Sequence, residues 1–110
     1  MGRDSLALVQ GTLDLMVLGI LAAGSAHGYG IAEQVREATT GDVVIQDGAL
    51  YQALHRLERQ GLVDAEWGAS ENNRRARYYS LTPKGRRHVR EQAEQWHRYA
   101  RALGAVLKRI

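Results

Sequence analysis

Residues 47–83 read DGALYQALHRLERQGLVDAEWGASENNRRARYYSLTP, and the hydrophobic pattern changes its period within this stretch. In the first part, apolar side chains recur at the spacing of one face of a helix. They are Leu50, Ala53, Leu54 and Leu57. Asp47 can cap this helix, and Gly61 can end it. The pattern therefore predicts a helix over residues 47–60 with one buried stripe.

After Gly61 the period shortens to two residues. Val63, Ala65 and Trp67 alternate with acidic residues, as they would in a half-buried strand. A second alternating run covers residues 76–81, and the polar loop between the two runs ends in consecutive arginines. These features predict a β-hairpin with a basic turn.

Two further helices are expected before this stretch. Apolar residues at helical spacing indicate a buried first helix. They are Leu6, Val9, Leu13, Met16 and Ile20. A glycine-rich segment, residues 24–30, interrupts the pattern, and residues 31–39 then predict a short helix with Ile31 and Val35 facing inward. The predicted fold is mainly α with a small β-hairpin, and the order of its elements over residues 1–82 is that of a winged helix-turn-helix.

Thr82 and Pro83 begin the last predicted helix, residues 83–110, because a threonine hydroxyl caps well and proline suits the first helical position. Its apolar residues alternate in steps of four and three, which is the seam of a coiled coil. They are Val89, Ala93, Trp96, Ala100, Leu103, Leu107 and Ile110. Part of this seam could pack on the domain itself, but its length favours a dimerisation helix covered by a second copy of the chain.

The length of 110 residues indicates one domain, and its charge is unevenly distributed. Residues 1–50 carry two basic and six acidic side chains, whereas residues 51–110 carry thirteen basic and six acidic ones. Between Asn72 and Arg90 there are seven basic residues and no acidic one, which favours a polyanionic partner over a merely solvated surface. The absence of cysteine excludes disulfides and thiolate zinc sites. No apolar run approaches the length of a membrane span, so we expect a cytoplasmic protein without membrane contact.

Polar and aromatic side chains occupy the face of the 47–60 helix that lies opposite its apolar stripe. They are Tyr51, Gln52, His55, Arg56 and Arg59. A helix with such a face fits the major groove of DNA, and a basic hairpin beside it can reach a neighbouring groove or phosphate. Any one of these residues could be an ordinary surface side chain; together they favour nucleic acid.

Two segments, Gly48 to Val63 and Arg74 to Gly85, resemble the PadR family of bacterial transcriptional regulators. His27-Gly28-Tyr29-Gly30-Ile31 and Gly11-Thr12-Leu13-Asp14 are also similar to that family. The single C-terminal helix and the total length resemble its short subfamily. The resemblance implies a homodimer that binds a roughly palindromic DNA operator, usually as a repressor and often released by a small aromatic or lipophilic effector.

Carried over by position, the resemblance makes residues 48–56 the recognition helix and residues 68–78 the wing. The DNA-binding residues it implies are Tyr29, Gly48, Ala49, Tyr51, Gln52, His55, Arg56, Arg74, Arg75 and Arg77. Tyr51 would lie near a phosphate, and Gln52 and His55 would read bases. Many members have Ser or Thr at the position of Ala49 and Pro at that of Gln52. The resemblance therefore does not tell which bases this chain reads.

Trp96 on the predicted seam is either ordinary core or one wall of an effector site. The second interpretation follows from the resemblance to drug-sensing members, in which a Trp from each subunit flanks a planar ligand. The candidate lining residues beside Trp96 are Leu8, Val9, Asp14, Leu15, Gln92, Ala93, Tyr99 and Ala100.

Other functions find little support in the sequence. Glu94 and His97 have the spacing of a di-iron helix but lack the further carboxylates that such a site needs, so no metal or other cofactor is expected. No nucleophile motif indicates an enzyme. The alternatives that stay open are a protein-interaction module and an RNA binder, for which Tyr78 and Tyr79 are the adjacent aromatic pair.

Overall fold

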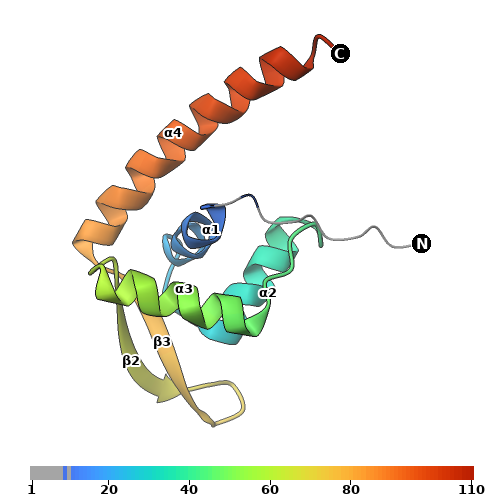
Figure 1. The fold of residues 1–110 in the computed structure, drawn as a ribbon. Coiled ribbons are helices and arrows are strands. Elements are labelled where there is room, and N and C mark those ends of the chain that lie inside the picture. The colour runs from blue at the N-terminus through green and yellow to red at the C-terminus, as the bar shows by residue number, and fades with distance from the viewer. Residues whose placement is uncertain (1–8, 10) are drawn as a thin grey trace.

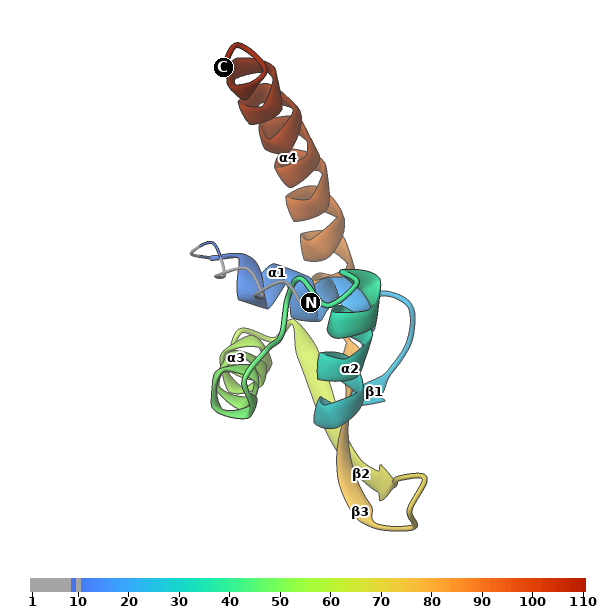
Figure 2. The same ribbon diagram turned by 90° about the vertical axis from the view of Figure 1, so that its right-hand side faces the viewer.

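The structure is a computed structural model that describes Val9 and residues 11–110, and it confirms the predicted winged helix-turn-helix with a long C-terminal helix (Figure 1). Its elements are α1 (Thr12–Leu21), β1 (Ala26–His27), α2 (Gly28–Ala38), α3 (Asp47–Arg59), β2 (Val63–Ala69), β3 (Arg75–Leu81) and α4 (Pro83–Leu107). The hairpin and α4 project from opposite ends of the core formed by α1, α2 and α3 (Figure 2). None of the helices in this part of the chain is both long and apolar enough to cross a membrane.

The first helix is buried, but not through the stripe that its spacing predicts. Val17, Leu18 and Leu21 are its fully buried apolar residues, whereas Leu13, Met16 and Ile20 are only partly buried. Helix α1 contacts α2, α3 and α4, and an almost entirely apolar sequence does not mark one face over another. Leu6 lies outside the described residues, and Val9 is exposed and precedes the helix.

Helix α2 begins at Gly28, three residues earlier than predicted, and Ile31 and Val35 face the core as expected. The His27 Nδ1 atom accepts a hydrogen bond from the Gly30 N–H at 3.0 Å, so the histidine caps the helix. Ala26 and His27 also pair with Tyr79 and Tyr78 as the edge strand β1. A two-residue strand has no period of its own, which is why the sequence did not predict it.

Helix α3 buries its predicted stripe, Leu50, Ala53, Leu54 and Leu57, against the core. Asp47 does not cap it: Gln46 occupies the cap position, and its side chain makes no capping hydrogen bond. At the other end the Leu62 N–H donates to the Leu57 carbonyl at 2.9 Å, and Gly61 has a φ of 74°. Gly61 therefore ends the helix with a left-handed turn, as predicted.

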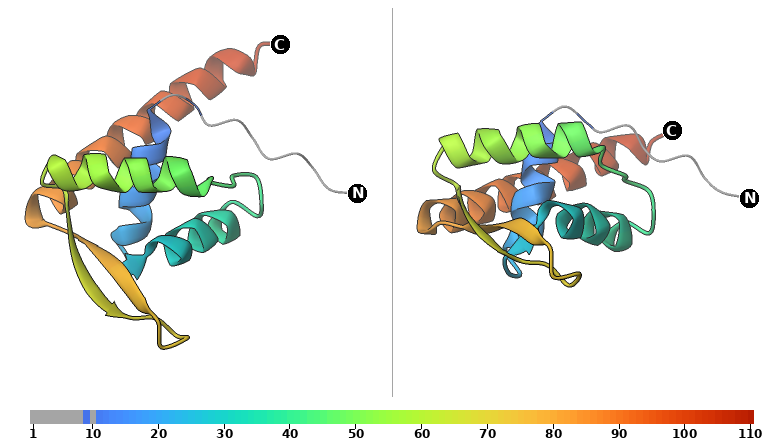
Figure 3. Two further views of the ribbon diagram at one scale, coloured as in Figure 1. Left: turned by 60° about the horizontal axis from the view of Figure 1, so that its bottom comes forward. Right: turned by 90° about the horizontal axis from the view of Figure 1, so that it is seen from below.

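Strands β2 and β3 form the antiparallel hairpin, with Val63 opposite Leu81 and Ala69 opposite Arg75. The prediction that Trp67 is half-buried with Val63 and Ala65 is wrong, because its side chain is 59% exposed. Alternation assigned Trp67 to the correct face of the sheet. The hairpin extends beyond the core (Figure 3), and Trp67 and Ala69 on this face are both exposed.

Helix α4 begins as predicted, with the Thr82 hydroxyl accepting from the Gly85 N–H at 2.9 Å, and ends at Leu107 rather than Ile110. A Cβ atom on Gly85 would lie 2.0 Å from the Leu62 carbonyl oxygen, so glycine permits close packing of α4 on the start of β2. Val89 is buried in the core, whereas Trp96, Leu103 and Leu107 farther along the seam are exposed.

Candidate nucleic-acid interface

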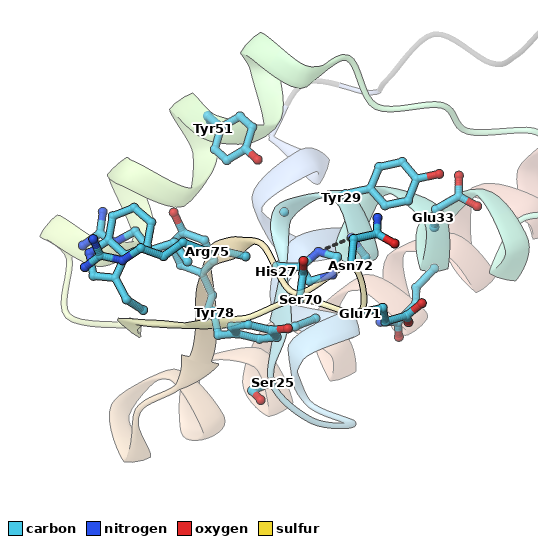
Figure 4. A pocket seen from close by; sticks show the side chains of 18 of the residues that line it. Ser25, His27, Tyr29, Glu33, Tyr51, Ser70, Glu71, Asn72, Arg75 and Tyr78 are labelled. Carbon is cyan, nitrogen blue, oxygen red and sulfur yellow. Dashed lines mark hydrogen bonds between the residues drawn. The ribbon is translucent and has the colours of Figure 1, made fainter.

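A concave groove of about 930 Å³ lies between α2, α3 and the hairpin (Figure 4). Its walls carry many of the residues predicted to bind DNA: Tyr29, Tyr51, His55, Arg75 and Arg77. The Tyr29 side chain is 71% exposed there, and Trp67 and Tyr78 contribute further aromatic rings. The fold thus brings the α2 start, the recognition helix and the wing to one surface.

The approach of Tyr51 to α2 depends on Gly28. A Cβ atom at Gly28 would lie 2.6 Å from the Tyr51 Oη atom, so a larger residue there would displace the phenol from the start of α2. The His27 ring meets Tyr78 edge-on, with ring centroids 5.4 Å apart, and stacks with Tyr29 at 6.4 Å. These contacts connect the start of α2 to the wing.

The outward face of α3 is open to solvent at Gly48, Gln52 and His55, while Ala49 is half-buried. Arg56 is differently placed, because its guanidinium binds the Asp14 carboxylate on α1 through two hydrogen bonds of 2.6 and 3.3 Å. The hydrogen bond and charge of Asp14 raise the pKa of Arg56 above its ordinary value. This link joins residues 42 positions apart, and no local pattern could have indicated it.

The three wing arginines have different surroundings. Arg74 is exposed at the turn, and Arg75 lies over the Trp67 ring with its guanidinium carbon 4.6 Å from the ring centroid. Arg77 donates to the Glu58 carboxylate on α3 at 3.0 Å.

Burial raises the pKa of the neighbouring Tyr79 phenol, which stays neutral in the hairpin core.

A second cavity, of about 690 Å³, lies between α1, α4 and the end of α3. Five of the candidate effector residues line it: Asp14, Leu15, Gln92, Trp96 and Tyr99. Ala93, Ala100 and Val9 are not part of its lining, and Leu8 lies outside the described residues. His88 and Gln95 line it as well, and their helical spacing from Gln92 and Tyr99 was the signal that could have identified them.

In the part of the chain that the structure describes, no three His, Asp or Glu side chains gather as a metal site. Glu94 and His97, whose spacing suggested a di-iron helix, are both exposed on α4.

The profile of the Transcriptional regulator PadR-like family matches residues 17–91, which include α2, α3 and the whole hairpin. The chain belongs to the PadR-like family. It is therefore a DNA-binding transcriptional regulator and not an enzyme, as the sequence predicted.

Solved structures agree with this PadR-like assignment. The chain superposes with a TM-score of 0.77 on a transcriptional regulator from Clostridium thermocellum, at 30% identity over 87% of this chain and 93% of the other. It also superposes with a TM-score of 0.77 on a PadR family transcription regulator from Clostridium difficile, at 28% identity over 88% and 99% of the two chains.

Among curated sequences, the transcriptional regulator YqjI of Escherichia coli is 28% identical to this PadR-like chain over 97% of its length. The match covers only 52% of YqjI. An uncharacterized protein of Lysinibacillus sphaericus is 25% identical, over 81% of this chain and 82% of its own length.

Proposed function

We propose that the chain is a homodimeric, ligand-responsive repressor that binds a dyad-symmetric operator through α3 and the wing. The observation that carries this proposal is the shared groove, in which Tyr51 and His55 of α3 face the same space as Arg75 and Arg77 of the wing. A helix can then enter the major groove while the arginines bind phosphates beside it. Gln52 and His55 would read bases, and Tyr29 and Tyr51 would contact the backbone.

The second copy of the chain would cover the far part of α4. Beyond Val89 the seam exposes Trp96, Leu103 and Leu107 in the single chain. Such a row of large apolar side chains is typical of a helix that pairs with another. Residues 1–82 would then bind DNA and residues 83–110 would dimerise, although Gly85 and Val89 also anchor α4 on the core. We expect this regulator to work in the cytoplasm, where its DNA is.

The cavity beside Trp96 would hold a planar aromatic or lipophilic effector. Trp96 and Tyr99 place two rings 5.9 Å apart along its wall, and Asp14 contributes a carboxylate from α1. Asp14 also binds Arg56 of the recognition helix, so an effector that engages this carboxylate would compete with Arg56. The cavity and the DNA-binding face thereby share one ion pair.

RNA binding through Tyr78 and Tyr79 gains no support from the geometry. Neighbouring residues of a strand point to opposite faces, and Tyr79 is buried in the core while the Tyr78 hydroxyl donates to the Ala69 carbonyl at 2.8 Å. The two rings cannot form one stacking platform for bases.

The DNA-binding proposal is tested by titrating a fluorescent duplex with the protein at several salt concentrations. We expect affinity to fall steeply with salt, and Arg74→Ala to reduce the slope of log K against log salt by about one unit. Arg98→Ala, which removes the same charge from an exposed site on α4, is the matched control and should leave the slope unchanged. Binding without salt dependence, or tighter binding of single-stranded RNA than of duplex DNA, would contradict the proposal.

The effector proposal is tested on a Trp67→Phe background, in which Trp96 is the one remaining tryptophan. Planar aromatic compounds should quench its fluorescence, and Trp96→Ala should abolish any effect of the same compounds on operator affinity. A panel that changes neither signal would make Trp96 an ordinary interface residue.

A further inference from the structure

Trp67 lies on β2 directly before the wing, and its packing does not explain its position. The residue pairs with Arg77 across the hairpin and shares a face with Val63 and Leu81. Because Arg77 reaches Glu58 of α3 from this face, Trp67 looks toward the recognition helix and not away from it. Its side chain lines the groove and is 59% exposed, although an indole is among the largest apolar groups a protein can bury.

Arg75 covers one side of this ring. Its guanidinium carbon lies 4.6 Å from the ring centroid, within the range of a cation–π interaction. The stack holds the guanidinium in place, so less side-chain entropy is lost when the cation meets an anion. Residues 68–78 contain three arginines and one acidic residue, so the surroundings of the pair suit a polyanion.

We propose that Trp67 and Arg75 act together as a DNA-contacting unit of the hairpin, with duplex DNA as the one occupant. The indole packs against deoxyribose in the minor groove beside the major groove that α3 enters, and the Arg75 guanidinium binds a phosphate of the same strand. The sugar rings of DNA have apolar surface on which the exposed indole can pack, and the phosphate carries a negative charge that pairs with Arg75. This inference rests on the proposed function and adds to it a residue that contributes affinity without charge.

The two members of the pair are separable by their response to salt. Trp67→Ala should weaken duplex binding about tenfold while the salt slope stays the same, because an apolar contact releases no counterions. Arg75→Ala should weaken binding and also reduce the slope by about one unit. Glu66→Gln, on the opposite face of the same strand, is the control and should cause no loss of affinity.

A fluorescence experiment tests the contact without truncating Trp67, so it stands even if Trp67→Ala destabilises the hairpin. In a Trp96→Phe protein all tryptophan emission comes from Trp67. Acrylamide quenching is measured with and without a 30-base-pair duplex taken from a random-sequence selection, while anisotropy of a dye on the DNA reports binding. We expect DNA to shift the emission to shorter wavelength and to lower the quenching constant at least twofold.

The outcomes separate this inference from the proposed function. Saturated DNA binding with unchanged emission and quenching of Trp67, or with full affinity of Trp67→Ala, would overturn the Trp67 contact alone. A wild-type chain that binds no duplex at low salt would overturn the proposed function and this inference with it.

Discussion

Helices α3 and α4 have the same kind of sequence and opposite surroundings. Each carries one apolar stripe at helical spacing, but Leu54 of α3 is fully buried, whereas Leu103 of α4 is 45% exposed. The stripe of α3 meets α1, α2 and β2 of its own chain, while α4 leaves the core after Val89 (Figure 1). An amphipathic period alone therefore does not tell whether a helix packs on its own chain, and the fold shows that α3 does and that the far part of α4 does not.

The largest expected effect on stability comes from truncating a residue of the buried stripe of α3. Leu54→Ala should lower the free energy of unfolding by about 2–5 kcal/mol, because it leaves a cavity in a core with no solvent access. Chemical denaturation followed by circular dichroism measures this loss. Gln52→Ala, on the exposed face of the same helix, should change stability by less than about 0.5 kcal/mol. Equal effects of the two variants would mean that the stripe of α3 is not the core.

Gly85 lies where α4 joins the core, and its substitution should cause the next largest loss of stability. Gly85→Ala should destabilise the fold by about 1–3 kcal/mol, because its Cβ atom would meet the Leu62 carbonyl oxygen at 2.0 Å. Gly104→Ala in the same helix is the matched control: apart from the nearby chain of its own helix, no described atom lies within 4 Å of its Cβ position, so higher helix propensity should stabilise it slightly. Thermal unfolding of both variants compares them, and an unchanged Gly85→Ala protein would refute the close approach.

The exposed stripe of α4 is tested by its effect on self-association. Leu103→Asp should raise the dissociation constant of the dimer at least about tenfold, since it places a charge on an apolar seam. Ala105→Asp, on the opposite side of the same helix turn, introduces the same charge away from the seam and should leave association unchanged. Analytical ultracentrifugation distinguishes them, and a wild-type chain that is monomeric at high concentration would contradict the two-chain unit.

The smallest effect concerns the ion pair between Asp14 of α1 and Arg56 of α3, which lies beside the cavity between α1 and α4. Asp14→Asn should hardly move the unfolding midpoint, because the Arg56 and Asp14 side chains are 41% and 30% exposed and water screens the pair. It should instead free Arg56 to meet phosphate, which would raise the salt slope of DNA binding by up to about one unit. Glu94→Gln on α4 is the charge-matched control. A slope that Asp14→Asn leaves unchanged would argue against a DNA contact of Arg56.

Local patterns in the sequence predicted most of the fold, since Thr82, Gly61 and the stripe of α3 each act within one or two helical turns. Local patterns could not predict contacts between residues that are far apart in the sequence. The Asp14–Arg56 and Arg77–Glu58 pairs depend on how α1, α3 and the hairpin pack. Trp67 shows the same limit, because alternation gives its face of the sheet but not where the core beneath that face ends.

The sequence predicted individual residues of the groove but not the groove itself. The resemblance to PadR regulators indicated Tyr29, Tyr51 and the wing arginines. The fold places both tyrosines, Arg75 and Arg77 around one cavity, whereas Arg74 is not part of its lining. In the sequence Gly28 belongs to a glycine-rich segment and to a PadR-like motif, and its close approach to Tyr51 emerges only from the packing of α2 against α3.

Selection of bound sequences from random duplex DNA tests the central claim most directly. If two chains joined through α4 each present an α3 and a wing, the selected sequences should converge on two half-sites in dyad symmetry, spaced by about one helical turn of DNA or a multiple of it. Leu103→Asp protein should recover the half-site without the fixed spacing. Convergence on a single asymmetric site, or no enrichment at low salt, would contradict the account.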